Sequence, residues 1–124
     1  MKDDCLFCKI IKKKIPSFIL YEDEDLMVIL DAYPDADGHT LIIPKKHYKD
    51  ILELDNDTLI KLFDKARELT TRLMEKLGKD AITFVINYGE AQAIKHFHLH
   101  LIPNYIKKEH KLSKEEVYKI LTED

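Results

Sequence analysis

Residues 95–103 read KHFHLHLIP and place a histidine at every second position of an apolar run. Because side chains alternate between the two faces of a β-strand, His96, His98 and His100 share one face, about 6.5–7 Å from one to the next. The apolar residues between them occupy the other face. We therefore expect residues 98–103 to form a strand that packs a core on one side and carries a polar site on the other.

Four further strands are expected upstream of this one. Two apolar runs, residues 18–21 and 26–30, flank the acidic stretch EDED and predict a hairpin. Residues 39–44 read HTLIIP, follow a turn-rich loop and predict a third strand. Residues 81–86 read AITFVI and predict a fourth.

One long helix is expected between the third and fourth strands. Its apolar residues recur at helical spacing as far as Leu77, with Gly78 in the position of a C-terminal cap. Asp55 or Asp57 is the candidate N-cap. Strands before and after one long helix predict an α+β fold with a mostly antiparallel, five-stranded sheet.

Short helices are expected near both termini. Leu6, Ile10 and Ile11 recur at helical spacing, which predicts a helix over residues 6–13. Ser113 and Glu116 have the spacing of a capping box at the start of a last helix.

The composition limits the classes of protein to which this sequence can belong. A chain of 124 residues fits one domain, residues 1–124, and its 45% hydrophobic content supplies a core. A net charge of −3 predicts no general affinity for nucleic acid or for anionic membranes. The apolar runs are shorter than the roughly 20 residues of a membrane span, and the first residues lack the order of a secretory signal. We expect a cytoplasmic protein in a reducing compartment.

Three explanations of the histidine pattern compete. In the first, the histidines merely line a half-exposed face of the sheet. In the second, an HxH pair binds a catalytic metal through neutral imidazole nitrogens. In the third, one histidine is a covalent nucleophile and the others hold phosphate, because a neutral imidazole attacks at pH 7 without first losing a proton. His39 and His47 could join any of these sites if the segment HTLIIPKKH lies close by.

The sequence resembles the histidine triad (HIT) family over nearly its whole length. HFHLHLI at residues 96–102 matches the family's His-φ-His-φ-His-φ-φ pattern, where φ is apolar. GHTLIIPKKH at residues 38–47 and NYG at residues 87–89 lie at the expected distances before it. CLFCKII at residues 5–11 is similar to the start of family members.

The resemblance implies roles for individual residues. It makes His98 the nucleophile, His100 a contact of the α-phosphate and His39 a residue that frames the active histidine. It places Asp31 at the ribose hydroxyls. The remaining substrate-binding positions are Asn87, which resembles a phosphate-binding asparagine, and Gln92 in the loop before the triad. Five further residues would line a slot for the base: Leu6, Phe7, Ile10, Ile29 and Leu30.

Two departures from the family pattern concern the loop NYGEAQAIK. The loop is about two residues shorter than expected between the asparagine and the triad. Ala93 and Lys95 stand where a serine and an aromatic residue are expected. Since that serine would have touched phosphate or the leaving group, leaving-group preference is left open. For Lys95 we favour a solvated position at the strand edge over a role in charge compensation.

Cys5 and Cys8 form the only CxxC pair of the sequence. Two idle buried thiols and a redox pair are alternatives, although no thioredoxin-like βαβ order accompanies them. Some bacterial histidine triad proteins resemble this arrangement and hold a structural zinc. Tetrahedral zinc needs two more ligands, and His47 and His96 are the candidates.

The function implied by the resemblance is hydrolysis or transfer at the α-phosphate of purine nucleoside phosphoramidates, through a nucleotidyl-histidine intermediate. A purine nucleotide is then the partner molecule, and the long helix and an edge strand are expected to form a homodimer. Alternatives are cleavage of dinucleoside polyphosphates, a nucleotide-binding or interaction module with little turnover, and a metal-dependent hydrolase that uses the HxH pair.

Overall fold

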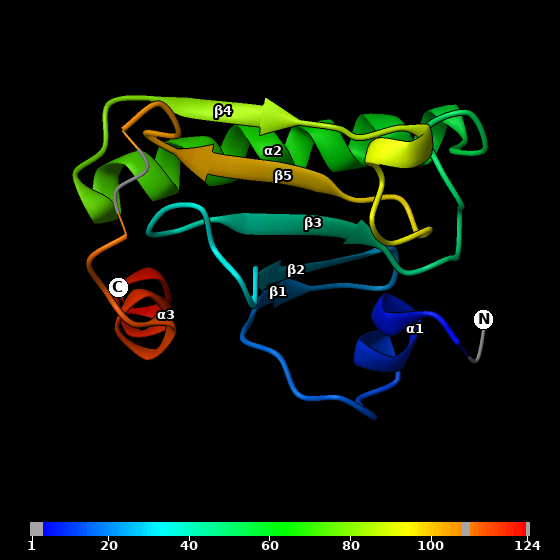
Figure 1. Ribbon diagram of the computed structural model, residues 1–124, viewed down its shortest axis with the longest axis horizontal. Coiled ribbons are helices and arrows are strands. Elements are labelled where there is room, and N and C mark those ends of the chain that lie inside the picture. The colour runs from blue at the N-terminus through cyan, green and yellow to red at the C-terminus, as the bar shows by residue number, and fades with distance from the viewer. Residues whose placement is uncertain (1–3, 108–109, 124) are drawn as a thin grey trace.

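The computed structural model describes residues 4–107 and 110–123. Its centre is one five-stranded sheet in the order β1-β2-β3-β5-β4, and every neighbouring pair of strands is antiparallel (Figure 1). The α+β class and the antiparallel sheet are therefore confirmed. The strands are β1 (Ile19–Glu22), β2 (Leu26–Leu30), β3 (Thr40–Pro44), β4 (Ile82–Val85) and β5 (Leu99–Pro103).

Helices cover both faces of this sheet. One apolar core joins a face of the sheet to α2 (Asn56–Leu77) and α3 (Lys114–Thr122), and it includes Phe97, Leu99 and Leu101. A second core joins the other face to α1 (Leu6–Ile11). Alternation along the strand therefore directs His96, His98 and His100 to the side of α1, as the sequence predicts.

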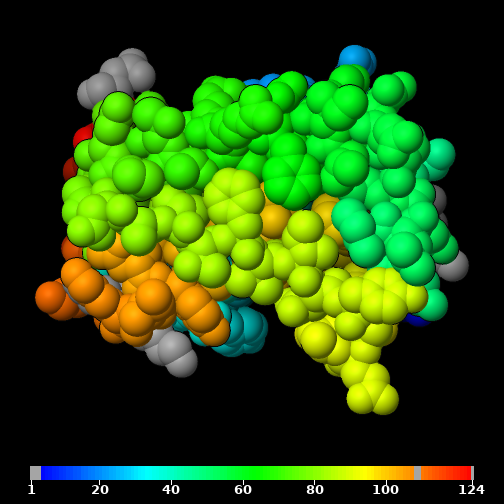
Figure 2. All heavy atoms as spheres, turned by 90° about the horizontal axis from the view of Figure 1, so that it is seen from above, coloured from blue at the N-terminus to red at the C-terminus, as the bar shows by residue number. Residues whose placement is uncertain are grey.

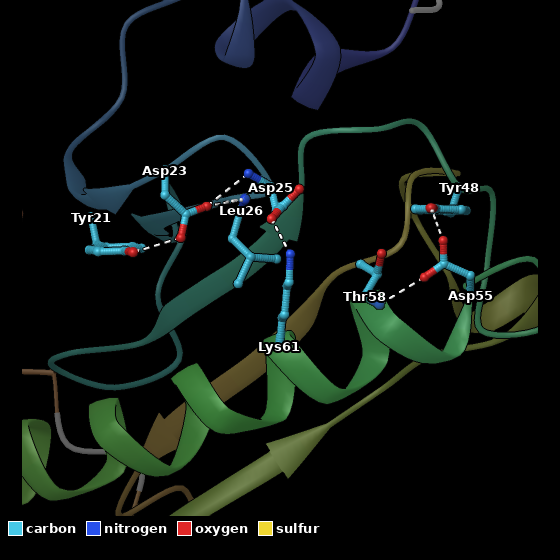
Figure 3. A network of polar contacts seen from close by, with 8 residues as sticks. All are labelled: Tyr21, Asp23, Asp25, Leu26, Tyr48, Asp55, Thr58 and Lys61. Atoms are coloured by element: carbon cyan, nitrogen blue, oxygen red, sulfur yellow. Dashed lines mark hydrogen bonds and ion pairs between the residues drawn. The ribbon is translucent and has the colours of Figure 1, made fainter.

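Local polar groups fix the start of α2. The Asp55 carboxylate is its N-cap and accepts a hydrogen bond from the Thr58 amide at 2.7 Å and another from the Tyr48 hydroxyl at 2.8 Å (Figure 3). These bonds, first of all the one from the Thr58 amide, lower the pKa of Asp55 to about 2. Lys61, one turn further along, pairs with Asp25 of the β1–β2 turn at 2.5 Å. Of the two candidate caps, Asp55 is the one used.

β2 has the expected bounds, and the ends of several other elements differ from expectation by one or two residues. α1 ends at Ile11 and not at residue 13, because Lys13 takes a left-handed φ of 64°. Gly78 caps α2 with a φ of 64°, and the capping box of Ser113 and Glu116 is present. A short 3₁₀ turn, η1 (Gly89–Ala91), was not expected from the sequence.

None of the helices in the described ranges, 4–107 and 110–123, combines the length and the apolar composition that a membrane crossing requires.

Candidate active site and metal centre

The pairing of β3 with β5 assembles the histidine site. Leu41 of β3 lies opposite His100 of β5, so His39, two residues before Leu41, comes next to His100. The rings of His98 and His100 have centroids 4.8 Å apart, and those of His39 and His100 are 5.1 Å apart. Phe7 of α1 lies edge-on to the His98 ring at 4.9 Å. The three residues predicted to be catalytic are thus in one cluster.

Hydrogen bonding assigns the proton positions of His98. Its Nδ1 lies 2.9 Å from the carbonyl oxygen of His96, which can only accept, so Nδ1 carries the proton. The lone pair of the neutral ring is then on Nε2. Burial, opposed by the hydrogen bond to His96, lowers the pKa of His98 below its usual range. At neutral pH the ring therefore keeps an unprotonated nitrogen.

A second chain of hydrogen bonds orients His39 and His100. The main-chain amide of Asp35 donates to Nδ1 of His39 at 3.0 Å, which leaves the His39 proton on Nε2. That nitrogen lies 2.9 Å from Nδ1 of His100 and donates to it. His100 in turn carries its proton on Nε2, where it can be donated to an anion. Burial lowers the pKa of both rings, so His39 and His100 are neutral at pH 7.

Asp31 lies at the edge of this cluster. Its Oδ2 is 3.4 Å from Nε2 of His39, and its Oδ1 accepts the Tyr33 amide at 2.8 Å. The side chain is 18% exposed. A carboxylate has about four lone-pair positions, so Asp31 retains acceptor capacity toward solvent.

The residues predicted to hold the base divide between the two faces of the sheet. Phe7, Ile10 and Ile29 lie together in the apolar cluster under α1, next to the histidines. Leu6, also on α1, is 42% exposed. Leu30 packs in the core on the opposite face, so the structure does not bring it to the other four.

The loop before β5 is held by its own contacts. Gln92 is buried, and its Nε2 donates to the carbonyl oxygens of Lys49 at 2.6 Å and Ile94 at 3.0 Å. Asn87, between β4 and η1, is partly buried. Binding of phosphate by these two residues stays a prediction.

Lys95 is exposed, in keeping with the solvated position that we favoured. Its ammonium donates to the Gly89 carbonyl at 2.6 Å, which closes the shortened loop. Together with Ala93 it lines a cavity of about 650 Å³ beside Cys5 and His47. The two positions that depart from the family pattern therefore face the same open space.

Cys5, Cys8, His47 and His96 converge at the N-terminal end of α1. Their ligand atoms all lie within 4.8 Å of one another. The Sγ of Cys8 is 3.3 Å from Nδ1 of His47 and 3.5 Å from Nδ1 of His96, and the Sγ of Cys5 is 3.3 Å from Nδ1 of His96. Zinc bonds of about 2.3 Å to sulfur and 2.0–2.1 Å to nitrogen separate tetrahedral S and N ligands by about 3.5 Å. The four side chains therefore fit a tetrahedral metal.

The surroundings of the cluster favour the same conclusion. Nε2 of His96 donates to the Pro44 carbonyl at 2.8 Å, which leaves the lone pair on Nδ1 toward the sulfurs. Burial lowers the pKa of His96 to about 4 and raises that of the Cys5 thiol. A bound cation would favour the Cys5 thiolate that burial disfavours.

A second group of possible metal ligands, Asp31, His39 and His100, has its ligand atoms within 4.8 Å of one another. The Asp35 amide argues against a metal there. Because it donates to Nδ1 of His39, Nε2 of the neutral ring carries a proton and has no lone pair for a cation. The Asp31, His39 and His100 group is therefore not favoured as a metal site.

Comparison with known proteins agrees with this geometry. The HIT domain family profile matches residues 12–107, from the end of α1 to beyond β5. The chain belongs to the HIT family. A HIT-like protein of Methanocaldococcus jannaschii is 43% identical over 103 residues, which is 82% of this chain and 79% of that relative. The adenylylsulfatase HINT3 of Arabidopsis thaliana is 37% identical over 83% of this chain and 53% of its own length.

HIT family crystal structures share the whole fold. A zinc-bound histidine triad protein from Mycobacterium smegmatis superposes with a TM-score of 0.88 and 32% identity, over 96% of this chain and 91% of that one.

Several groups in and around the candidate site were not foreseen from the sequence. They are main-chain atoms: the Asp35 amide that orients His39, and the Pro44 carbonyl that orients His96. No residue type signals them, because every residue except proline offers an amide and every residue a carbonyl. Asp37, a buried carboxylate two residues before His39, was also missed.

Proposed function

We propose that this HIT protein hydrolyses or transfers nucleotides at the α-phosphate of purine nucleoside phosphoramidates, with His98 as the covalent nucleophile. The observation that supports this most is the hydrogen bond from Nδ1 of His98 to the His96 carbonyl, with Nε2 left as the nucleophilic nitrogen. A HIT protein of Legionella pneumophila described as a hydrolase superposes with a TM-score of 0.72 at 34% identity.

The reaction takes two steps. In the first, Nε2 of His98 attacks phosphorus, a bond forms between that nitrogen and phosphorus, and the bond from phosphorus to the leaving amine breaks. The amine takes a proton from solvent as it leaves. The positive charge that develops on the His98 ring is stabilised by the His96 carbonyl at Nδ1. In the second step water attacks phosphorus, the bond from Nε2 of His98 to phosphorus breaks, and a proton of the water passes to solvent. The nucleoside monophosphate and neutral His98 are released.

His100 and His39 serve the phosphate in this scheme. The proton of His100 lies on Nε2, so this ring can donate to a phosphate oxygen without being charged. His39 determines that proton position, because its own Nε2 donates a hydrogen bond to Nδ1 of His100. Asp31 accepts from the ribose hydroxyls, and the purine lies against Phe7, Ile10 and Ile29.

The leaving group is the least constrained part of the substrate. The adenylylsulfatase relative is named for a substrate whose leaving group is sulfate and not an amine. Ala93 and Lys95, the positions that depart from the family pattern, line one cavity beside His47. We infer that these residues tune the leaving group, and that dinucleoside polyphosphates are the second candidate substrate class.

Zinc is the metal that we propose for the Cys5, Cys8, His47 and His96 cluster. Two thiolates and two neutral imidazoles are a ligand set of structural zinc sites. The metal would cross-link α1 to the turn after β3 and the segment before β5. Its contribution is to the fold, and no step of the reaction uses it.

A homodimer through β4 and α2 completes the proposal. β4 is an edge strand, and β5 is its only partner among residues 4–107 and 110–123. Figure 2 shows α2 and β4 side by side across one face of the molecule. Exposed apolar side chains belong to both elements and to the segment after β4: Ile60, Phe84, Ile86 and Tyr88. A second copy would cover this face and pair the open edge of β4.

A substrate panel tests the proposal. Adenosine phosphoramidates, adenylyl sulfate and diadenosine polyphosphates are assayed at equal concentration, with the metal content of the same protein determined in parallel. Phosphoramidates should give the highest kcat/KM. Equilibrium binding of AMP without turnover of any substrate would instead identify a nucleotide-binding module.

A further inference from the structure

The loop between β2 and β3 carries Asp31 and His39 and is covered by a segment from the other end of the chain. Its own ends are tied together, since the Asp31 amide donates to the His39 carbonyl at 3.0 Å and the His39 amide to the Ala36 carbonyl at 3.1 Å. The covering segment is residues 111–114, which lead into α3.

Asp37 makes the central contact between loop and segment. Its Oδ1 accepts the Leu112 amide at 3.0 Å and the Lys111 amide at 3.1 Å, and its Oδ2 accepts the Lys111 amide at 3.0 Å. Asp37 is 4% exposed. A carboxylate this buried is stable as an anion only when hydrogen bonds replace its water, so these two amides hold the loop and the segment together.

A second contact lies on the other side of the loop. The ammonium of Lys114 donates to the Ala32 carbonyl, next to Asp31, at 3.1 Å. The void left between loop and segment is about 10 Å³, which is no more than one water needs. Loop and segment are therefore in direct contact.

The segment is itself anchored firmly. Val117 and Leu121 of α3 are buried in the core with α2. Arg72 of α2 holds the end of α3 by donating to the Leu121 carbonyl from two guanidinium nitrogens, at 2.5 and 2.9 Å. A contact to residues 111 and 112 is thus a contact to the body of the molecule.

From these contacts we infer that Asp37 is a positioning residue of the nucleotide site. Its carboxylate fastens the loop 31–39 to residues 111–112, and through that bond holds Asp31 and His39 in line with His100. The role of Asp31 and His39 in nucleotide binding rests on the proposed function. The attachment of the loop to residues 111–112 rests on the hydrogen bonds alone.

Asp37→Asn is the test, with Asp23→Asn as the matched control. Asp23 likewise accepts two main-chain amides, those of Asp25 and Leu26 at 2.8 Å each, but at the opposite end of β2 (Figure 3). Each substitution keeps one oxygen and removes the charge. Two quantities are measured on full-length protein at pH 7: the ring ¹⁵N spectrum of the histidines without ligand, and the ratio of Kd values for 2′-deoxyAMP and AMP.

The wild type should show His39 as a single neutral tautomer with the proton on Nε2. In Asp37→Asn the His39 and His100 signals should move toward a mixture of tautomers and the Kd ratio should fall toward one, while Asp23→Asn keeps both wild-type values. Unchanged ring signals in Asp37→Asn, or equal changes in the control, would overturn the inference. A wild type that binds the two nucleotides equally would refute the ribose role of Asp31, and the ring spectrum would still decide the role of Asp37.

Asp37→Glu covers the case in which Asp37→Asn does not fold. This variant keeps the charge but moves the carboxylate by one methylene relative to the Lys111 and Leu112 amides. A shift of the His39 signals in the same direction would support the inference, and an unshifted spectrum would contradict it.

Discussion

Nδ1 of His98 lies 2.9 Å from the carbonyl oxygen of His96, two residues earlier on the approach to β5. One residue thus supplies a ring to the Cys5 and Cys8 cluster and a carbonyl to the candidate nucleophile. The orientation of His98 is therefore set by the path of the main chain. Because Nδ1 carries the proton, Nε2 is the nitrogen with a free lone pair. The roles of the two residues can be separated by substitution.

Replacing His98 with Asn should lower turnover by roughly 10³-fold or more, because the nitrogen that attacks phosphorus is gone. The Kd for AMP should change much less, since Asp31 and the apolar residues under α1 remain. Rates come from steady-state assays and Kd from titration calorimetry. His110→Asn, which changes an exposed histidine, is the control. Normal turnover in His98→Asn with an inactive His96→Asn or His100→Asn would move the nucleophile elsewhere.

The pH profile should show an acid limb below pH 6.5, the ordinary pKa of histidine. Burial lowers the pKa of His98, so the neutral ring persists below pH 6.5. As pH falls through the lowered pKa, protonation removes the lone pair on Nε2 and kcat/KM falls with it. His100 lowers the pKa further and Asp31 opposes it. An acid limb at or above pH 6.5 would show that the nucleophile is not a buried neutral imidazole.

The metal prediction concerns composition and stability. Protein purified without chelator should contain about one zinc per chain, and Cys8→Ser should lose it and unfold at a lower temperature. A strong chelator should lower the Tm of the wild type and leave that of Cys8→Ser unchanged, which separates metal loss from the substitution itself. A metal-free wild type with two freely titrating thiols would refute the zinc site.

Asp31→Ala should weaken binding of AMP more than binding of 2′-deoxyAMP. A lost hydrogen bond to a charged group costs about 1.5–3 kcal/mol, which is about 10- to 100-fold in Kd. Asp31→Asn keeps an oxygen for the Tyr33 amide at 2.8 Å, so it separates the ribose contact from the local turn. Equal losses of affinity for both sugars would remove Asp31 from the ribose site.

The dimer prediction is tested at the edge strand. Phe84 of β4 is 41% exposed and lies against Phe63 of α2, with ring centroids 6.3 Å apart. Phe84→Glu should shift the protein from dimer to monomer in size-exclusion chromatography with light scattering, because it places a charge in the covered face. Ile106→Glu, at a position that is 94% exposed and belongs to neither α2 nor β4, should leave the dimer intact. A wild-type monomer at high concentration would refute the interface.

The sequence predicts the elements well because their signals are local. Period-two alternation in HFHLHLI assigns the faces of β5, and the Asp55 and Gly78 caps bound α2 within a residue. η1 escapes prediction, since a single 3₁₀ turn in a short loop has no periodicity to detect. The placement of Leu30 on the α2 side was missed because the resemblance gave Ile29 and Leu30 one role, although neighbouring strand residues face opposite ways.

The contacts within the site depend on pairing across the chain and were only partly foreseeable. His39 meets His100 because β3 pairs with β5, and 61 residues separate the two. Spacing in the sequence does not specify strand order, so this contact was expected only through family resemblance. The bond between Asp37 and residues 111–112 had no counterpart in the motifs that carry the resemblance.

The histidine rings take their orientation from main-chain atoms: the Asp35 amide for His39, the Pro44 carbonyl for His96 and the His96 carbonyl for His98. Alanine substitution leaves these main-chain atoms in place, so an alanine scan does not measure their contribution. Among the twenty residues only proline, which lacks the amide hydrogen, removes the donor at position 35. Neighbouring side chains can therefore vary widely over evolutionary time while the three tautomers stay fixed by the course of the backbone.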